Sequence, residues 1–472
     1  MALLLKRRHS LPTLALALDR PAERASSSRG QAVFTLQVGD DTVAQIKVAT
    51  AELNLPANLR ELSGYQYHDP AYTIPPAVID QIKAQLPAML PPGAPLWLLF
   101  ETSAGFLPLV PWEKLLQPQL GVPLLRIPNF LINPLADPSA LDVAICASSP
   151  VTEPAIPLEE LLLRITTELL NSVQRRVRVD VFADIRAYDS LRSRVEQAGL
   201  GAQVRVHNPR ESRPLRSRSP APPSSVGGAW LEWIGGALEG RSVDLAYFVA
   251  HGCLASDDGL LLLAESPTRN EDREIFVGAQ QIDSFLTAVG AWSVGFSAPP
   301  HNYSGSGLRL LAEQLAHARP GPLLLHDFAE DSSCGGLGAA FRFLFNRTGI
   351  APATPAISLY CHPDYVRPEV SDSYGIEPAA GKLGQLTLAQ NEACRKLLQS
   401  KDATPGWLAK SQRVLEKSAA ELERTEPFED TPSATRAGSE RALSFVADVL
   451  SRFATSPPSE PSDQPHDEEH AP

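Results

Sequence analysis

Short apolar runs that each end in polar or turn residues recur along the chain from about residue 96. They cover 96–100, 141–147, 177–182, 204–207, 243–250, 292–297, 323–327 and 356–360. Between them, apolar residues return at helical spacing over 158–173 and 308–318. Strands that alternate with helices predict βαβ units, and therefore an α/β fold with a mostly parallel sheet flanked by helices. In such sheets ligands bind at the carboxyl ends of the strands.

The first residues show a different pattern, in which Leu14, Leu16 and Leu18 alternate with alanines. This alternation predicts a strand, and 33–38 predicts a second one that pairs with it in a hairpin. The basic residues at 6–8 followed by an apolar run are also typical of a short signal peptide, but no small-residue cleavage site follows before Asp19. We therefore expect an N-terminal β-rich extension over residues 1–90.

We assign residues 91–365 to the α/β domain. After it, the spacing of apolar residues along the chain becomes helical. Apolar residues at helical spacing over 386–398, 407–422 and 442–453 predict a C-terminal helical region, residues 366–455. The last segment, 456–472, holds five acids, five prolines and no lysine or arginine, which predicts a disordered acidic tail. The arginine-, serine- and proline-rich stretch 209–225 predicts a flexible surface loop, with a local anion patch as the alternative.

Composition narrows the function classes. The 42 basic and 54 acidic residues give a net charge of −12, which disfavours bulk binding to nucleic acid or to an anionic membrane. No apolar run reaches the length needed to cross a bilayer. Five scattered cysteines without paired spacing argue against a disulfide scaffold or a zinc site and indicate a reducing, cytoplasmic location. Proline is abundant, at 43 of 472 residues.

The sharpest local signal is the apolar run 243–250, which ends abruptly in His251-Gly252 and is followed by a polar turn and a second apolar run, 260–264. A histidine at the carboxyl end of a parallel strand is placed to act as a general base. A glycine beside it lets a backbone N–H approach a substrate oxyanion. The alternative is a strand-end histidine satisfied by backbone groups.

Four features follow one another in a recognisable order. They are Pro-Trp-Glu at 111–113, the strand from 141 that leads into the helix from 158, the aromatic-rich strand into His251-Gly252 with its hairpin, and the strand 292–298. In this order they resemble the CHAT domain family, relatives of the caspases, over about residues 96–363. The resemblance implies a caspase-like fold with a six-stranded sheet. It also implies that the histidine is the general base and that a cysteine at the end of the next strand is the nucleophile.

The sequence departs from the family where the nucleophile should stand. The strand 292–298 is followed by Pro299, in the position where the family has its cysteine. The loss is double, because proline has neither a thiol nor a backbone N–H to donate to an oxyanion. Loss of one oxyanion donor alone slows such reactions by about 10² to 10³. By this alignment the site is a vestigial one.

Other residues could supply the chemistry. Cys334 in the glycine-rich turn 331–336 is the best substitute nucleophile, because a helix beginning behind it would lower the pKa of its thiol. Cys253 is adjacent to the His-Gly pair and points away from it, Cys146 is expected in the core, and Cys361 has no paired metal ligand near it. We therefore predict no metal site.

Three further motifs have a structural and a functional interpretation. His326-Asp327 would form an acid/base pair or cap a loop. The polar segment 301–307 would bind a ligand or cap the following helix. The glycines at 335, 336 and 338 suggest a phosphate loop, but the full fingerprint and its lysine are missing, so no nucleotide cofactor is predicted.

Two functions follow from this pattern. The first is a degenerate peptidase that keeps His251 and Gly252 and acts as a regulatory or protein-binding component of a bacterial signalling or defence system, as the resemblance implies. The second is an active cysteine endopeptidase that pairs His251 with the relocated nucleophile Cys334. The expected partner is a protein or peptide in both cases.

Overall fold

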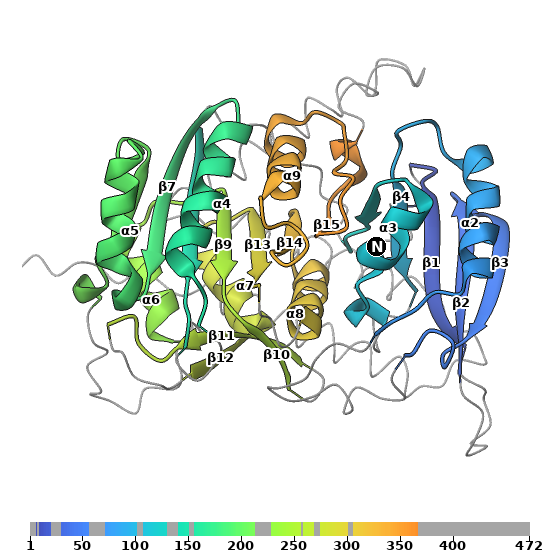
Figure 1. Cartoon of the computed structure of the whole chain (residues 1–472), viewed down its shortest axis with the longest axis horizontal. Helices are drawn as coiled ribbons and strands as arrows, with labels where there is room; N and C mark the ends of the chain where they lie inside the picture. Colours follow the sequence, from blue (N-terminus) through green and yellow to red (C-terminus); the bar gives the residue numbers. More distant parts are fainter. Residues whose placement is uncertain are drawn as a thin grey trace, which may run out of the picture. The chain divides into compact units, whose positions relative to one another are not determined.

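The protein is built around a large twisted sheet, seen in a computed structural model (Figure 1). Its strands are β1 (Pro12–Asp19), β2 (Gln31–Val38), β3 (Asp41–Ala49), β4 (Leu96–Phe100), β5 (Leu124–Arg126), β6 (Ala140–Ala147), β7 (Arg176–Ala183), β8 (Val204–His207), β9 (Leu245–Val249), β13 (Ser293–Ala298), β14 (Leu323–Asp327) and β15 (Ile357–Tyr360). These 12 strands lie in the order β3-β2-β1-β4-β5-β15-β14-β13-β9-β6-β7-β8. The antiparallel pairs are β1–β2, β2–β3 and β14–β15, and all other neighbours are parallel. The predicted α/β fold with a mostly parallel sheet is confirmed.

The structure describes residues 6, 9–19, 30–55, 71–101, 107–129, 140–150, 155–212, 228–255, 258–268, 274–300 and 305–366. All belong to the first of two compact units, Met1–Glu377. The second unit, Pro378–Pro472, lies outside the described residues. The predicted C-terminal helices, the acidic tail and most of the loop at 209–225 therefore also lie outside them.

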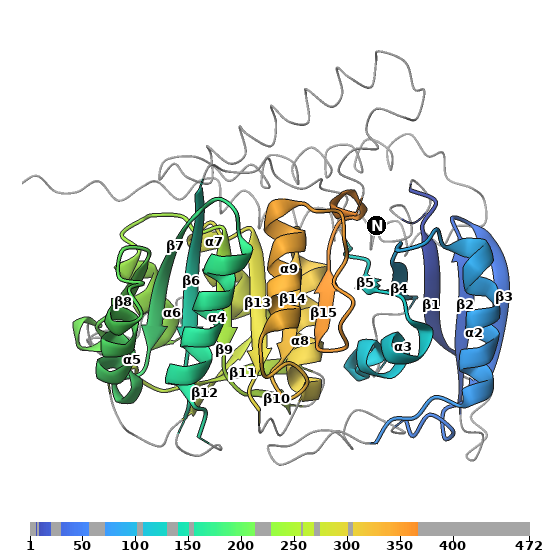
Figure 2. The same cartoon turned by 45° about the horizontal axis from the view of Figure 1, so that its top comes forward.

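Helices cover both faces of the sheet (Figure 2). They are α2 (Pro76–Met89), α3 (Trp112–Leu120), α4 (Leu158–Ser172), α5 (Ile185–Gln197), α6 (Ala229–Ala237), α7 (Ala279–Ala288), α8 (Gly305–Ala318) and α9 (Gly335–Asn346). One core joins the sheet to α4, α5 and α9, and a second joins the opposite face to α6, α7 and α8. A third core lies under α2 and α3 in the N-terminal half. The strands buried on both faces explain the continuous apolar runs of the sequence.

The N-terminal segment forms the hairpin that its alternation predicted. Leu14 and Leu16 of β1 are buried, and Leu14 pairs with Leu36 of β2. On its other side β1 runs parallel to β4, so the predicted extension contributes three strands to the same sheet as the rest of the unit. The apolar run after the basic residues is thus a buried strand of the fold.

A second, three-stranded sheet consists of β10 (Gly252–Ala255), β11 (Asp258–Ala264) and β12 (Glu274–Gly278). It follows directly on β9 and packs against α8. Glycines permit this close approach: a Cβ on Gly259 would lie 2.2 Å from the Leu311 nitrogen, and one on Gly307 would lie 2.3 Å from the Cys253 oxygen. The His-Gly motif therefore stands at the junction between the large sheet and this small one.

Candidate functional site

The two strand ends named by the sequence lie side by side. β9 and β13 are neighbours in the parallel part of the sheet, and Val249 pairs with Ser297. His251 and Pro299 each follow two residues later, so both leave the sheet at the same carboxyl edge. Both are buried, and His251 is 2 % exposed. The structure thus brings the predicted base and the vestigial nucleophile position to the same edge of the sheet.

Gly252 is the first residue of β10 and faces α8. A Cβ at this position would lie 2.4 Å from Cγ of Leu308 and 2.9 Å from its backbone nitrogen, distances that no side chain tolerates. The glycine is therefore required by helix packing. This packing reason is independent of the oxyanion role predicted for Gly252 from its place beside His251.

Cys334 does not have the environment that its place before a helix suggested. It is the N-cap residue of α9, with a φ of 61°, but its side chain is fully buried in the core beneath α4 and α9. Burial, followed by the nearby Asp331 carboxylate, raises the pKa of the Cys334 thiol to about 12. The expected lowering of this pKa was wrong, because desolvation outweighs the helix dipole. At neutral pH the thiolate needed for attack is almost absent.

The other cysteines of the described chain are equally buried. Cys146, Cys253, Cys334 and Cys361 are not in disulfides. Burial raises the pKa of Cys146 and Cys361 far above the ordinary value. Cys146 is a core residue, as predicted. Within the described ranges no group of histidines, cysteines and carboxylates is arranged to hold a metal ion.

A buried polar chain crosses three neighbouring strands beside the candidate edge. The Tyr247 hydroxyl of β9 lies 2.6 Å from Oγ of Ser297 on β13, and that oxygen lies 3.1 Å from Nδ1 of His326 on β14. On the far side of the ring, Nε2 lies 3.3 Å from a carboxylate oxygen of Asp331. Gly295, which pairs with Tyr247, makes room for the chain, since a Cβ there would lie 2.3 Å from the tyrosine ring.

This chain of Tyr247, Ser297, His326 and Asp331 includes the serine, histidine and aspartate of a hydrolase triad. A substrate, however, has no access to Ser297. Ser297 and His326 are both fully buried. Burial raises the pKa of Tyr247 well above its usual value. Burial alone would also raise the pKa of Asp331, but the contacts with His326 and with the Leu337 N–H outweigh it and lower this pKa. The chain is therefore a fixed internal network, and Ser297 cannot reach a substrate.

His326 and Asp327 have different structural roles. His326 belongs to the buried chain, whereas Asp327 turns the other way and accepts a hydrogen bond from the Ala329 N–H at 2.9 Å. This bond caps the turn that follows β14, which is the structural alternative of the sequence prediction. The segment 301–304 lies outside the described residues, and α8 begins at Gly305.

The glycines of the presumed phosphate loop serve helix packing. Gly335, Gly336 and Gly338 lie in the first turn of α9. A Cβ on Gly338 would lie 1.9 Å from a carboxylate oxygen of Glu168 on α4, and one on Gly336 would lie 2.9 Å from Thr354. Gly336 and Gly338 thus let α9 approach its neighbours closely.

Glu113 of the Pro-Trp-Glu motif belongs to a second buried network, which sequence reasoning did not find. Its two carboxylate oxygens accept from Arg126 of β5 at 2.7 and 2.9 Å. Arg126 also donates to the Tyr360 hydroxyl of β15 at 2.8 Å, and Tyr360 donates to Glu313 of α8. Glu113 and Arg126 are each 1 % exposed. The motif therefore connects the N-terminal strands to β15 and α8.

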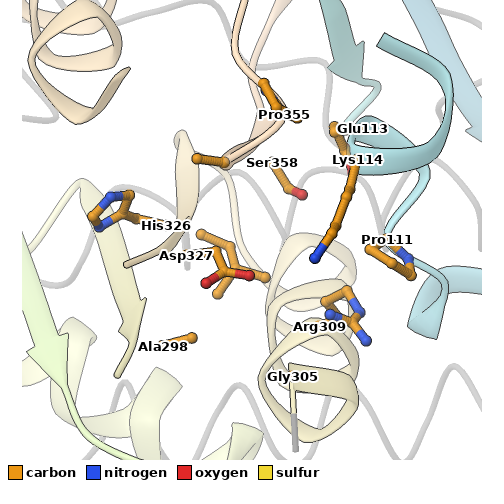
Figure 3. A pocket seen from close by; sticks show the side chains of 12 residues that line it. Pro111, Glu113, Lys114, Ala298, Gly305, Arg309, His326, Asp327, Pro355 and Ser358 are labelled. Atoms are coloured by element: carbon orange, nitrogen blue, oxygen red, sulfur yellow. The ribbon is translucent and has the colours of Figure 1, made fainter. Parts of the chain in front are cut away.

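A small cavity of about 40 Å³ opens at the same sheet edge (Figure 3). Ala298 and Asp327 line it at the ends of β13 and β14, Lys114 and Arg309 line it from α3 and α8, and Ser358 closes it from β15. His251 is not among the residues that line it. The cavity therefore lies on the side of the β13 end that faces β14 and β15, away from His251.

No family model matches the chain, and no curated protein does either. The CHAT resemblance therefore rests on the four sequence features alone. Among the helices that the structure describes, none is long and apolar enough to span a membrane.

Proposed function

We propose that this chain is a degenerate caspase-like peptidase of the CHAT type, which binds a protein or peptide partner without cleaving it. The observation that carries the proposal is the pairing of strand ends, in which His251 and Pro299 each follow two residues after the paired residues Val249 and Ser297. A base, His251, remains at the end of β9. At the end of β13, Pro299 has neither a thiol nor a backbone N–H. At the position where the resemblance puts the nucleophile, covalent attack on a peptide carbonyl therefore has none.

The sheet topology supports the caspase-like assignment. A histidine follows one strand of the parallel region, and the next strand of the large sheet along the chain, β13, lies directly beside it. This is the arrangement that the resemblance requires for a base and a nucleophile. The sheet has 12 strands instead of the six that the resemblance implies, and β15-β14-β13-β9-β6-β7 is a continuous block within it.

The alternative is an active endopeptidase in which Cys334 replaces the missing nucleophile. A side chain with no solvent exposure and a thiol pKa of about 12 argues against it. Attack would require the start of α9 to leave its core, together with Gly336 and Gly338, which are tightly packed there. The geometry therefore favours binding over catalysis.

We also propose where in the cell the protein acts and what class of partner it binds. The lack of disulfides among the described cysteines is in keeping with a cytoplasmic protein. The resemblance points to a regulatory component of a bacterial signalling or defence system. The partner would contact the surface around β10, since this strand leads away from His251 and ends at the exposed Ala255.

Catalysis is tested with an electrophilic peptidyl probe that forms a stable bond to peptidase cysteines. We expect no labelling of the full chain that depends on His251. The matched variants are Cys334→Ala and His251→Ala. Labelling that disappears in both would establish a peptidase and overturn the proposal.

Partner binding is tested with a photo-crosslinking amino acid at Ala255. The matched control is the same amino acid at Ala202, which is also exposed but stands before β8, at the opposite edge of the sheet. We expect a discrete adduct from position 255 alone, reproduced when the identified protein is purified and mixed with the chain. Adducts of equal yield from both positions, or none from either, would contradict the proposed binding surface.

A further inference from the structure

The cavity between α3, α8 and β15 has room for one small group. About 40 Å³ corresponds to roughly three water molecules. A nucleotide or a peptide segment is too large for it. The occupant must therefore be a small ion, or a single group of a larger molecule that reaches inside.

Ser358 is the residue that indicates a ligand. It is 8 % exposed, and Figure 3 shows its hydroxyl pointing into the cavity. Its backbone pairs with Leu325, but among the residues that the structure describes no hydrogen bond uses the hydroxyl. Without a protein partner, this hydroxyl can hydrogen-bond to whatever occupies the cavity, water or a ligand.

Two positively charged side chains lie near this hydroxyl. Figure 3 shows the Lys114 ammonium pointing toward the same space, with Arg309 beside it on α8. The first turns of α3 and α8 also line the cavity, through Pro111 and Gly305. Pro111 is the N-cap of α3 and gives no side-chain cap. The Trp112 N–H donates to the Val110 carbonyl at 2.9 Å, so the partial positive charge of the helix start rests on the amides that follow it. These groups favour an anion.

The negative charges nearby define which anion fits. Glu113 is neutralised by its bidentate pairing with Arg126. Glu330 lies 2.5 Å from the Lys114 nitrogen, but an ammonium has three N–H donors, so this contact leaves donors for a ligand. Asp327 presents its carboxylate to the cavity (Figure 3), whereas His326, which also lines it, is held by its contacts with Ser297 and Asp331. A carboxylate repels a fully ionised anion but accepts a hydrogen bond from an anion that carries a proton.

We propose that this cavity binds a protonated phosphate group. Ser358, Lys114 and the helix amides would donate to the ionised oxygens, and the P–OH would donate to Asp327. Sulfate has the same shape and carries no proton at neutral pH, so the same carboxylate would exclude it. The group can belong to inorganic phosphate or to a phosphate monoester, and the two share this chemistry.

The test is a calorimetric titration of the full chain with potassium phosphate and with potassium sulfate at matched ionic strength. At about pH 6, near the second pKa of a phosphate monoester, the protonated form is abundant. We expect phosphate to bind and sulfate not to bind. A parallel titration with O-phosphoserine separates the sources: tighter binding than inorganic phosphate assigns a monoester, and weaker binding assigns the free ion.

Three variants test the individual contacts. Ser358→Ala and Lys114→Met should each weaken phosphate binding by about tenfold, the loss expected for one hydrogen bond to a charged group. Asp327→Asn should admit sulfate, because its amide oxygen can still accept from the Ala329 N–H while the amide nitrogen donates into the cavity. Lys47→Met, which removes an exposed lysine from β3, is the matched control and should leave binding unchanged.

The outcomes decide the proposal without reference to the pseudopeptidase assignment. Equal binding of phosphate and sulfate, in the wild-type chain and in Asp327→Asn alike, would overturn it, as would a Ser358→Ala variant that binds as tightly as wild type. Unchanged melting temperatures of the unliganded variants would show that any loss is local. Selective phosphate binding that Asp327→Asn relaxes would establish the site.

Discussion

Ser297 Oγ lies 3.1 Å from Nδ1 of His326, and the two side chains come from paired positions on adjacent parallel strands. Since the Tyr247 hydroxyl approaches the same oxygen from the other side at 2.6 Å, one serine satisfies two buried partners. Removal of its hydroxyl leaves polar atoms on both strands without their contact.

Ser297→Ala should therefore lower the free energy of unfolding by about 1–3 kcal/mol, the usual cost of leaving a buried polar group unsatisfied. Urea denaturation followed by circular dichroism measures the change. Ser284→Ala is the control, because this hydroxyl lies on the exposed side of α7. A Ser297→Ala variant as stable as the control would show that the buried chain adds nothing to stability.

The Asp331 carboxylate should make stability depend on pH. Its pKa in the folded protein lies below the ordinary value of 3.8, despite the opposing effect of burial, because of its contacts with His326 and the Leu337 N–H. A lowered pKa adds stability above the unfolded value, and this stability is lost as the pH falls through the folded value. Asp331→Asn should therefore cost about 1–3 kcal/mol at pH 7 and progressively less below about pH 4.

Unfolding of wild type and Asp331→Asn at pH 7 and at pH 3 measures this difference. Asp41→Asn at the exposed start of β3 serves as the control and should alter stability little at either pH. A difference between wild type and Asp331→Asn that stays constant across this range would assign the effect to packing instead of charge.

Glu113 and Arg126 should be strongly coupled. Glu113→Gln leaves the guanidinium buried without its counter-charge, which costs about 3–5 kcal/mol. The double variant Glu113→Gln with Arg126→Met should recover part of that loss, because no buried charge is left over at this pair. The exposed pair of Lys47 and Asp19 is the comparison, since Lys47→Met should cost less than about 1 kcal/mol. Additive losses in the double variant would contradict the coupling.

Gly252→Ala should destabilise the protein because its Cβ would collide with the backbone nitrogen of Leu308 at 2.9 Å. We expect a loss of about 1–3 kcal/mol, typical of overpacking. Gly201→Ala is matched to it, since nothing lies within 4 Å of that Cβ. Thermal melting of both variants tests the packing role, and equal melting temperatures would refute it.

The buried thiols should be unreactive in the folded chain. Cys394 lies outside the described residues, so the experiment uses Cys394→Ser, which retains four of the five cysteines. With a chromogenic disulfide reagent at pH 8, we expect all four thiols to react in urea and almost none without it, because thiolates are the reactive species. A single fast thiol that disappears in Cys334→Ala would instead favour the relocated nucleophile.

Much of the large sheet was predictable because its strands are buried on both faces. The runs at 96–100, 204–207 and 323–327 coincide with β4, β8 and β14. β5 was missed because it has only three residues and includes Arg126, a charge that becomes tolerable inside the protein only through Glu113. That partner lies on α3, so the residues around β5 give no sign of it.

The candidate site, like the sheet, could be predicted from the sequence only in part. His251 was singled out because it ends a strand, which a sequence shows directly, and Pro299 was singled out from the family resemblance. The network of Arg126, Tyr360 and Glu313 joins elements far apart in the chain, and the unused hydroxyl of Ser358 is visible only once the cavity around it is known. The wrong pKa direction for Cys334 has a similar cause, because helix position is local but desolvation depends on the whole core.

The placement of β15 has a consequence for synthesis on the ribosome. Tyr360 of β15 bonds to Arg126 of β5, 234 residues earlier, and β15 separates β5 from β14 in the finished sheet. At about 5–20 residues per second, the nascent chain waits roughly 12–50 s between the two strands. During that interval β5 has an open edge that is prone to wrong pairing. Changes in β15 should therefore lower the yield of folding in addition to the stability of the folded product.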